Sequence, residues 1–130
     1  MKTIFSILIA IVLLSSSCEK EDSVFRNLEG KWVIKKILVD PGDGSGRYRD
    51  VSEKHHIEFF KDGSAKSSYS VFGLQMLLSF KVMDSVQVTL SFKDTSSQPS
   101  TPYRYNFSGD TLVLNPPCFE GCGLKLVRLN

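Results

Sequence analysis

Apolar and polar residues alternate with a period of two along most of the chain, and turn sequences separate the alternating stretches. In 86–92 every second residue is Val, Leu or Phe, and in 103–107 every second residue is Tyr or Phe. Successive side chains of a β-strand point to opposite faces, so this period places one set in a core and the other in water. The pattern predicts strands over about 30–39, 55–60, 64–71, 75–83, 86–92, 103–107, 111–115 and 123–129.

Turn residues connect these predicted strands into one antiparallel series. Asp62-Gly63 is typical of a tight hairpin, because glycine tolerates the positive φ that such a turn needs. Beyond the signal-like N-terminus the chain contains a single alanine, Ala65, and many Val, Phe, Tyr, Thr and Ser residues, which disfavours helices. Short strands at regular spacing predict an all-β fold, a small eight-stranded antiparallel up-and-down barrel, with a β-sandwich as the alternative.

Two stretches depart from regular alternation. Residues 74–80 are almost continuously apolar, so this segment is predicted to be either a strand buried on both faces or partly helical. In 31–39 the adjacent Lys35 and Lys36 break the alternation, and a β-bulge there would restore it. A short helical turn is also expected over 24–28, because Ser23 can cap it.

The first seventeen residues have the pattern of an export signal. Lys2 supplies a positive charge, and the run 4–14 is apolar except for Ser6. A run of this length is too short for a bilayer, which takes about 20 residues of helix. Three serines then lead to Cys18. This arrangement resembles the lipobox of bacterial lipoproteins, in which the cysteine is lipidated and becomes N-terminal. Ordinary secretion with cleavage near Ser17 is one alternative, and a short apolar helix is the other.

The lipobox resemblance implies three parts: a lipoprotein signal peptide over 1–17, a lipidated tether with the helical turn over 18–27, and one domain over 28–130. Acyl chains on Cys18 would make the membrane a partner, because each buried methylene contributes about 0.8 kcal/mol. Lys20-Glu21-Asp22 resembles the signal that places some lipoproteins on the outer face of the outer membrane, although a solvated tether explains it equally well. The expected location is the cell envelope, as an outer-membrane lipoprotein exposed at the surface.

Composition supports a single folded domain and excludes several classes of function. The chain has 130 residues, 42% of them hydrophobic, which suits one core. Sixteen basic and fourteen acidic residues give a formal net charge of +2. A chain so close to neutral has no strong field to attract nucleic acid or an acidic substrate, so we expect no nucleic-acid partner.

The three cysteines are best explained by one lipidation site and one pair. With Cys18 assigned to lipid, Cys118 and Cys122 remain, separated by a short segment that contains Gly121. Outside the cytoplasm such a pair can form a stable disulfide, and the chain-entropy relation gives about 2 kcal/mol for so small a loop. Free thiols and a metal site are the alternatives, but no second cysteine pair completes a zinc site.

Motifs across the domain resemble the lipocalin-like family found on small bacterial lipoproteins. The resemblance covers 28–129 and rests on Leu28, Gly30-Lys31-Trp32, the glycine-rich run 41–46, Ile57-Glu58-Phe59 with Asp62-Gly63, the run 116–122 and Arg128. It implies a calycin-type eight-stranded barrel, with Gly30, Trp32 and Arg128 forming a structural motif at one barrel end. There Arg128 would pack over the indole of Trp32, a contact that contributes about 0.5–2 kcal/mol. The Thr-Asp-Tyr signature of larger lipocalins is absent.

Polar residues form no recognisable catalytic, cofactor or metal-binding constellation. His55 and His56 are adjacent, so on a strand they point opposite ways and are expected to be an exposed polar pair. Asp40, Asp43 and Asp50 flank the glycine-rich run, but their spacing does not fit an EF-hand, so a flexible surface loop is expected. No Ser-His-Asp or Cys-His set follows from the spacing. We therefore expect no enzymatic activity, cofactor or metal.

The expected function is that of a non-catalytic binding module for a small apolar ligand. An eight-stranded barrel has an interior just wide enough for side chains or one small ligand. The candidates for lining such a site are the bulky residues on the predicted inner face: Phe59, Phe80, Leu90, Phe92, Tyr105 and Phe107. The alternative is a protein-interaction or structural subunit of a cell-surface complex, with a surface protein as the partner. An enzyme acting through a lone polar group is the remaining hypothesis.

Overall fold

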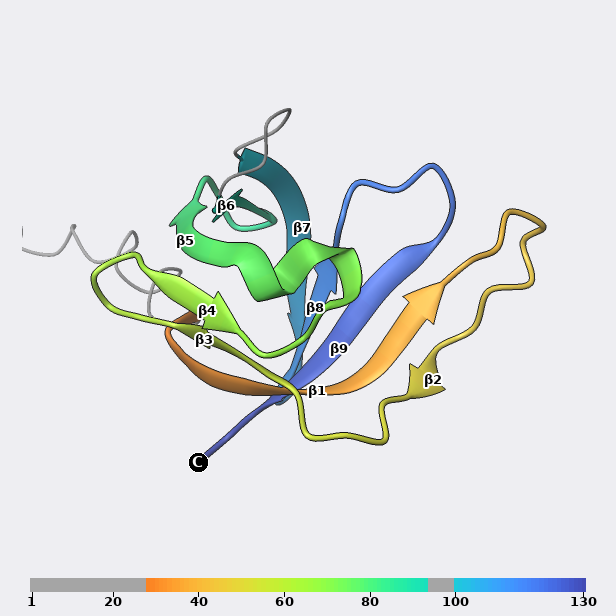
Figure 1. The fold of residues 1–130 in the computed structure, drawn as a ribbon, viewed down its shortest axis with the longest axis horizontal. Coiled ribbons are helices and arrows are strands. Elements are labelled where there is room, and N and C mark those ends of the chain that lie inside the picture. The colour runs from red at the N-terminus through yellow and green to blue at the C-terminus, as the bar shows by residue number, and fades with distance from the viewer. Residues whose placement is uncertain (1–27, 94–99) are drawn as a thin grey trace, which may run out of the picture.

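The computed structural model describes residues 28–93 and 100–130, which form an antiparallel β-barrel (Figure 1). The predicted signal peptide, the lipidation site Cys18, the tether and most of the helical turn lie outside the described residues. The elements are β1 (Gly30–Val39), β2 (Arg49–Asp50), β3 (His56–Phe59), β4 (Ala65–Ser67), the 3-10 helix η2 (Val71–Met76), β5 (Leu77–Val82), β6 (Gln87–Phe92), β7 (Ser100–Ser108), β8 (Thr111–Asn115) and β9 (Cys122–Arg128).

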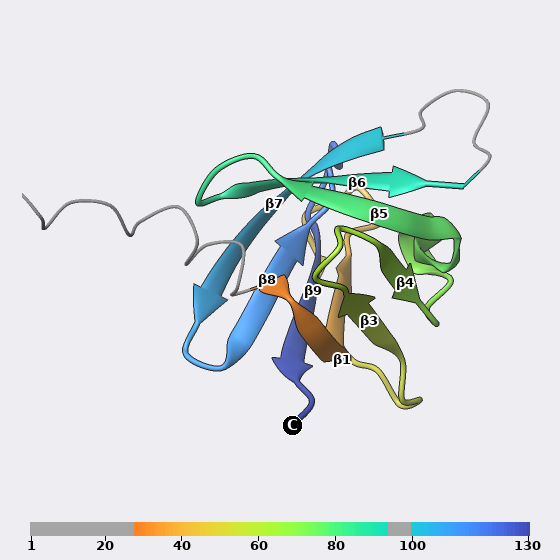
Figure 2. The same ribbon diagram turned by 90° about the vertical axis from the view of Figure 1, so that its left-hand side faces the viewer.

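The sheet has the order β4-β3-β1-β9-β8-β7-β6-β5, with β2 paired to β1 outside this path. Along this path the neighbouring strands are consecutive in the chain, with two exceptions. Only β2 separates β1 from β3, and β1 pairs with β9 to join the two ends of the series. The sheet curls until β4 lies beside β5, where Ser64 and Ser79 form an isolated bridge and Phe80 N–H donates to the Gly63 carbonyl at 2.9 Å (Figures 1 and 2). The result is a nearly closed eight-stranded barrel, which confirms the predicted fold class and excludes the sandwich.

The structure explains the two stretches in which the apolar and polar residues do not alternate. The register of β1 against β9 shifts between Ile34 and Lys36, so Lys35 is the extra residue of a bulge, as predicted. The bulge lets Lys35 and Lys36 both face water while Ile34 and Ile37 both contact the core. The prediction of a strand over 75–83 was wrong at its start, because η2 runs to Met76 and the strand begins at Leu77.

Three further boundaries differ from the sequence-based expectation. The strand predicted over 64–71 is only Ala65–Ser67, and β7 begins at Ser100, within the segment expected to be a loop. The two-residue strand β2 was not predicted. It forms because Val51 N–H donates to the Lys35 carbonyl at 2.9 Å and draws the end of the long loop against β1.

The core lies inside the barrel and is made of side chains from every long strand. Fully or almost fully buried residues include Leu28, Trp32, Ile34, Ile57, Phe59, Leu74, Phe80, Val88, Leu90, Leu112, Leu114, Leu124 and Leu126. No polar or charged residue of the described chain is buried. Among the described residues, no helix is long and apolar enough to cross a membrane.

Candidate functional sites

Four of the six side chains expected to line a ligand site belong to the buried core. Phe59, Phe80, Leu90 and Tyr105 are at most 5% exposed. The rings of Phe59 and Phe80 meet edge to face, with centroids 4.9 Å apart. Contacts of this kind are typical of a closely packed protein interior.

The other two residues of that set lie nearer the surface. Phe92 is partly buried and packs against the core. Phe107 is 36% exposed, because β7 carries it to the end of the barrel where Trp32 lies, 6.0 Å away between ring centroids. It shares a face with Tyr103 and Tyr105, so the alternation was right but the barrel ends before Phe107 is covered.

Gly30, Trp32 and Arg128 meet at this end of the barrel, where the resemblance placed them. Trp32 pairs with Arg128 across β1 and β9, and the guanidinium carbon lies 4.2 Å from the indole centroid. The indole N–H donates to the Leu28 carbonyl at 2.9 Å, and an Nη1 proton of Arg128 is donated to the Glu29 carbonyl. Gly30 has a φ of +121°, and a Cβ there would lie 2.6 Å from Arg128 Nη1, so only glycine fits.

A hollow of about 380 Å³ lies over this motif. Its lining is Trp32, Phe107, Gly109, Asp110, Val127, Arg128 and Asn130. The hollow is widely open to solvent, whereas small-molecule sites bury most of their ligand. Since Arg128 is engaged by Glu29 and Trp32, we assign this group a structural role.

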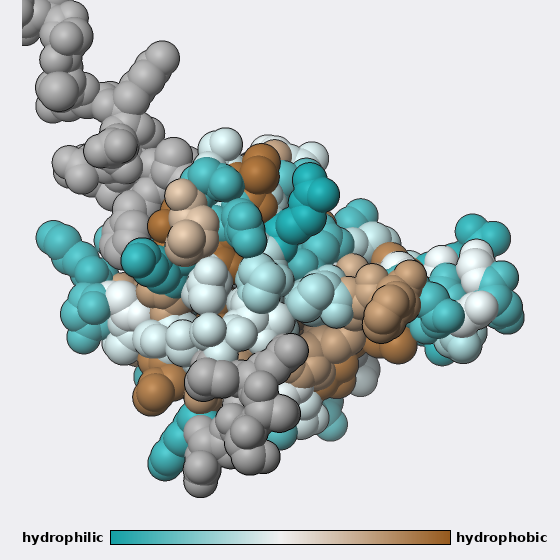
Figure 3. Space-filling view, turned by 90° about the horizontal axis from the view of Figure 1, so that it is seen from above, coloured by the Kyte–Doolittle hydropathy of each residue, from teal (hydrophilic) through white to brown (hydrophobic). Residues whose placement is uncertain are grey.

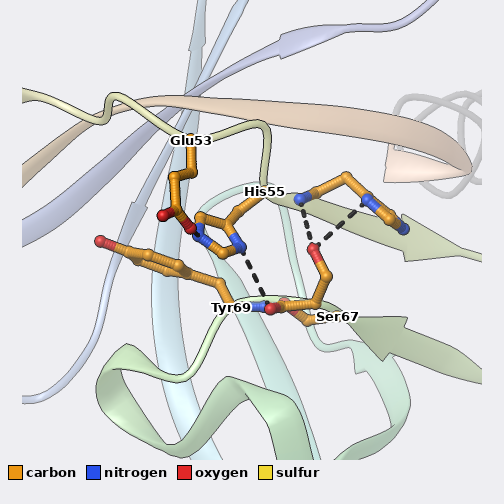
Figure 4. Close-up of polar contacts among 6 residues, drawn as sticks. Glu53, His55, Ser67 and Tyr69 are labelled. Atoms are coloured by element: carbon orange, nitrogen blue, oxygen red, sulfur yellow. Dashed lines mark hydrogen bonds and ion pairs between the residues drawn. The ribbon is translucent and has the colours of Figure 1, made fainter.

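The two histidines are half-buried and hydrogen-bonded, which corrects the expectation of an exposed pair. His55 lies between the carboxylate of Glu53, 3.2 Å from Nε2, and the ring of Tyr69, with Nδ1 3.1 Å from the Ser68 carbonyl (Figure 4). His56 contacts Ser68 instead: its backbone N–H donates to Oγ at 3.0 Å, and its Nδ1 lies 3.3 Å from that oxygen.

This cluster does not form a nucleophilic relay. The carboxylate contacts one histidine and the hydroxyl contacts the other, so no acid orients the ring that faces Ser68. Burial, followed by the charge of Lys31, lowers the pKa of His56 below its ordinary value. The contacts instead fasten the segment before β3 to the loop after β4. No group of three potential metal ligands occurs among the described residues.

A second region was not recognised from the sequence: a projection that we call the finger, residues 36–50 and 116–123. It contains the end of β1, the glycine-rich loop, β2, the loop between β8 and β9, and the start of β9 (Figure 1, right). Viewed from above, its tip is hydrophilic and an apolar area lies at its base (Figure 3). Within it, Phe119 is completely exposed and Val39 is 55% exposed.

The cysteine pair lies in the finger. Cys118 and Cys122 form a disulfide with their Cα atoms 6.1 Å apart, within the usual range. The bridge closes the loop that carries Phe119. The sequence contains a signal for this site, an aromatic residue between two cysteines and next to Glu120, although this pattern predicts a disulfide more directly than a surface.

Comparison with known proteins places this chain in no family. No family model, no curated protein and no solved structure matches it. Function therefore has to be argued from the barrel, its packed interior and its surface.

Proposed function

We propose that this protein is a membrane-tethered, lipocalin-like lipoprotein that acts as a non-catalytic interaction module, binding its partner with its outer surface. The observation that carries this proposal is the packing of the interior. Four of the six side chains expected to line a ligand site are buried core residues, and Leu74, fully buried, enters the same core from η2. What the molecule offers a partner is therefore its surface, where Val39 and Phe119 are exposed.

The remaining elements of the proposal come from the chain outside the described residues. The export-like segment 1–17 and Cys18 support lipidation, and Lys20-Glu21-Asp22 supports delivery to the outer face of the outer membrane. A protein tethered there by a short segment meets other envelope proteins at high local concentration. The motifs over 28–129 support the lipocalin-like assignment.

A second candidate function is carriage of a small apolar ligand inside the barrel, and one observation favours it. In η2, Phe72 has a φ of +58° and Gly73 a φ of +72°, so the segment that inserts Leu74 contains a left-handed, non-glycine residue. Such strain costs about 1–3 kcal/mol and is often stored in segments that move. Displacement of Leu74 would open space in the buried cluster that also contains Phe80 and Leu90.

Native mass spectrometry of the protein extracted from its own host separates the two functions. For a surface-acting module we expect the mass of the lipidated chain alone and no adduct after incubation with oleate. A co-purifying small molecule, or a one-to-one oleate adduct that the cavity-filling variant Leu90→Phe abolishes, would establish carriage and refute the surface proposal.

A further inference from the structure

The two loops of the finger are fastened to each other. The backbone N–H of Asp40 donates to the Gly121 carbonyl at 2.9 Å. A Cβ on Gly42 would lie 2.8 Å from both carboxylate oxygens of Glu120, so this carboxylate lies directly against the glycine backbone. On β1, Leu38 Cδ2 lies 3.6 Å from where a Cβ on Gly121 would be, an ordinary packing distance. The loop that carries Phe119 is therefore supported along one side by the glycine-rich loop.

Each loop is also held internally. The Asp40 carboxylate accepts hydrogen bonds from the backbone N–H groups of Gly42, Gly44 and Gly46, at 2.8, 3.2 and 2.9 Å. The loop is thus folded around one side chain, an arrangement that its sequence did not predict. The disulfide closes the second loop. A segment ordered before it binds loses less conformational entropy on binding, and this favours affinity.

Phe119 is the side chain that this framework presents. It is more exposed than Val39 and every other large apolar residue of the described chain. Burying a phenylalanine from water contributes about 1.5–3 kcal/mol, and aromatic residues are enriched in the buried centres of protein interfaces. A fully exposed aromatic on a loop that a disulfide closes is suited to act as the anchor of a contact.

Several charged residues lie in the two loops of the finger, and they bear on the kind of partner that it could bind. Asp40, Asp43 and Glu120 lie in the two loops that meet there. The N–H groups of Gly42 and Gly46 lower the pKa of Asp40, and the hydroxyl and N–H of Ser45 lower the pKa of Asp43, so both carboxylates stay ionised. Of the nearby cations, Lys36 pairs with Asp50 at 3.3 Å and Lys125 lies over the Tyr48 ring. Arg47 and Arg49 are exposed at the β2 end of the glycine-rich loop.

We propose that the finger binds a protein partner by inserting Phe119 into an apolar pocket that is rimmed by lysine or arginine. The carboxylates complement such a rim, whereas an anionic lipid surface would repel them. This inference rests on the proposed function and assigns its surface and its partner chemistry.

Site-specific photo-crosslinking in intact host cells tests the proposal on the full chain. Photoreactive p-benzoylphenylalanine replaces Phe119 in one strain. In two control strains it replaces Leu78 or Met83, two apolar residues outside the finger that are 55% and 54% exposed. We expect one protein adduct from position 119 alone, with the crosslinked peptide, identified by mass spectrometry, flanked by lysine or arginine. Thermal unfolding of each purified variant checks that the barrel is intact.

Charge neutralisation provides the second readout. In the strain with the probe at position 119, Asp43→Asn combined with Glu120→Gln should reduce the adduct yield at least threefold, since charges at an interface edge set the rate of association. The matched control is Asp110→Asn, an exposed aspartate at the other end of β8, which should leave the yield unchanged.

The other outcomes overturn the inference in distinguishable ways. Adducts from position 78 or 83 but not 119 would refute the finger as the docking surface and leave the proposed function standing. Crosslinks from 119 to lipid alone, or an adduct insensitive to the charge changes, would refute the assigned chemistry. No protein adduct from any position would refute both the inference and the proposed function.

Discussion

Single residues at the Trp32 end of the barrel show how local geometry restricts the sequence. Gly30 combines a left-handed backbone with a contact that leaves no room for a methyl group, so Arg128 can lie over Trp32 only if position 30 has no side chain. The Gly-x-Trp pattern and the distant arginine are thus parts of one arrangement.

Gly30→Ala should destabilise the protein by about 2 kcal/mol or more, because it adds backbone strain and displaces Arg128. Gly44→Ala is the control, since Gly44 also has a positive φ, +75°, but nothing lies within 4 Å of its Cβ position. Urea unfolding of both variants measures the difference. Equal losses would mean that the contact with Arg128 is irrelevant.

Tyr103 gives the protein a dependence on alkaline pH. Burial raises the pKa of Tyr103 to about 12 from 10. The folded state therefore holds this proton more tightly than the unfolded state, so the associated stability is complete below pH 10 and is lost as the pH rises toward 12. Tyr103→Phe should flatten the dependence of unfolding free energy on pH between 10 and 12. An unchanged slope in that variant would assign the effect to other groups.

At the scale of elements, the structure depends on segments whose periodicity changes. The run 74–80 is almost continuously apolar and contains parts of two elements. Leu74 enters the core from η2, while Leu77 and Phe80 enter it from β5, and Leu78 faces water. The sequence could not distinguish a strand from a helix here, because a short apolar run is compatible with both.

Leu74→Ala should cost about 2–5 kcal/mol of unfolding free energy, as expected for a fully buried leucine. Leu78→Ala, four residues away and 55% exposed, should change it by less than about 0.5 kcal/mol. Thermal or urea unfolding compares the two. Similar values for both variants would show that η2 does not contribute to the core.

The bulge in β1 leads to a prediction about deletion. Because Lys35 is the extra residue, removing it leaves Ile34 paired with Leu126 and Ile37 paired with Leu124. The barrel should therefore tolerate this deletion, although the finger would change direction. Deleting Thr89 from the regular strand β6 should unfold the barrel, since it moves one half of the apolar set to the outer face. Circular dichroism distinguishes the outcomes.

At the scale of the whole molecule, a barrel with a filled interior is joined to an N-terminus that resembles a lipid anchor. The buried side chains of its strands form one core cluster. The finger extends from this rigid body on β1 and β9.

Cys18→Ser should move the protein from the membrane pellet to the soluble fraction of host cells, because acyl chains require the thiol. Cys118→Ser is the matched control and should leave the protein in the pellet, since that cysteine belongs to the finger. Immunoblots of fractionated cells measure the distribution. A Cys18→Ser protein that stays in the pellet would refute the lipid anchor.

The sequence by itself determined most of the strands, the bulge at Lys35 and the cysteine pair, because these depend on local periodicity, turn chemistry and short separations. Contacts between distant segments decided the rest. They determine whether the sheet closes, which side chains fill the interior and which residues project from the surface. Phe107 and Leu90 occupy equivalent positions in their alternating patterns, yet only Leu90 is buried, because the end of the barrel leaves Phe107 uncovered. Likewise, only the packing of Asp40 and Glu120 against the glycine backbone places Phe119 at the surface of a fixed projection.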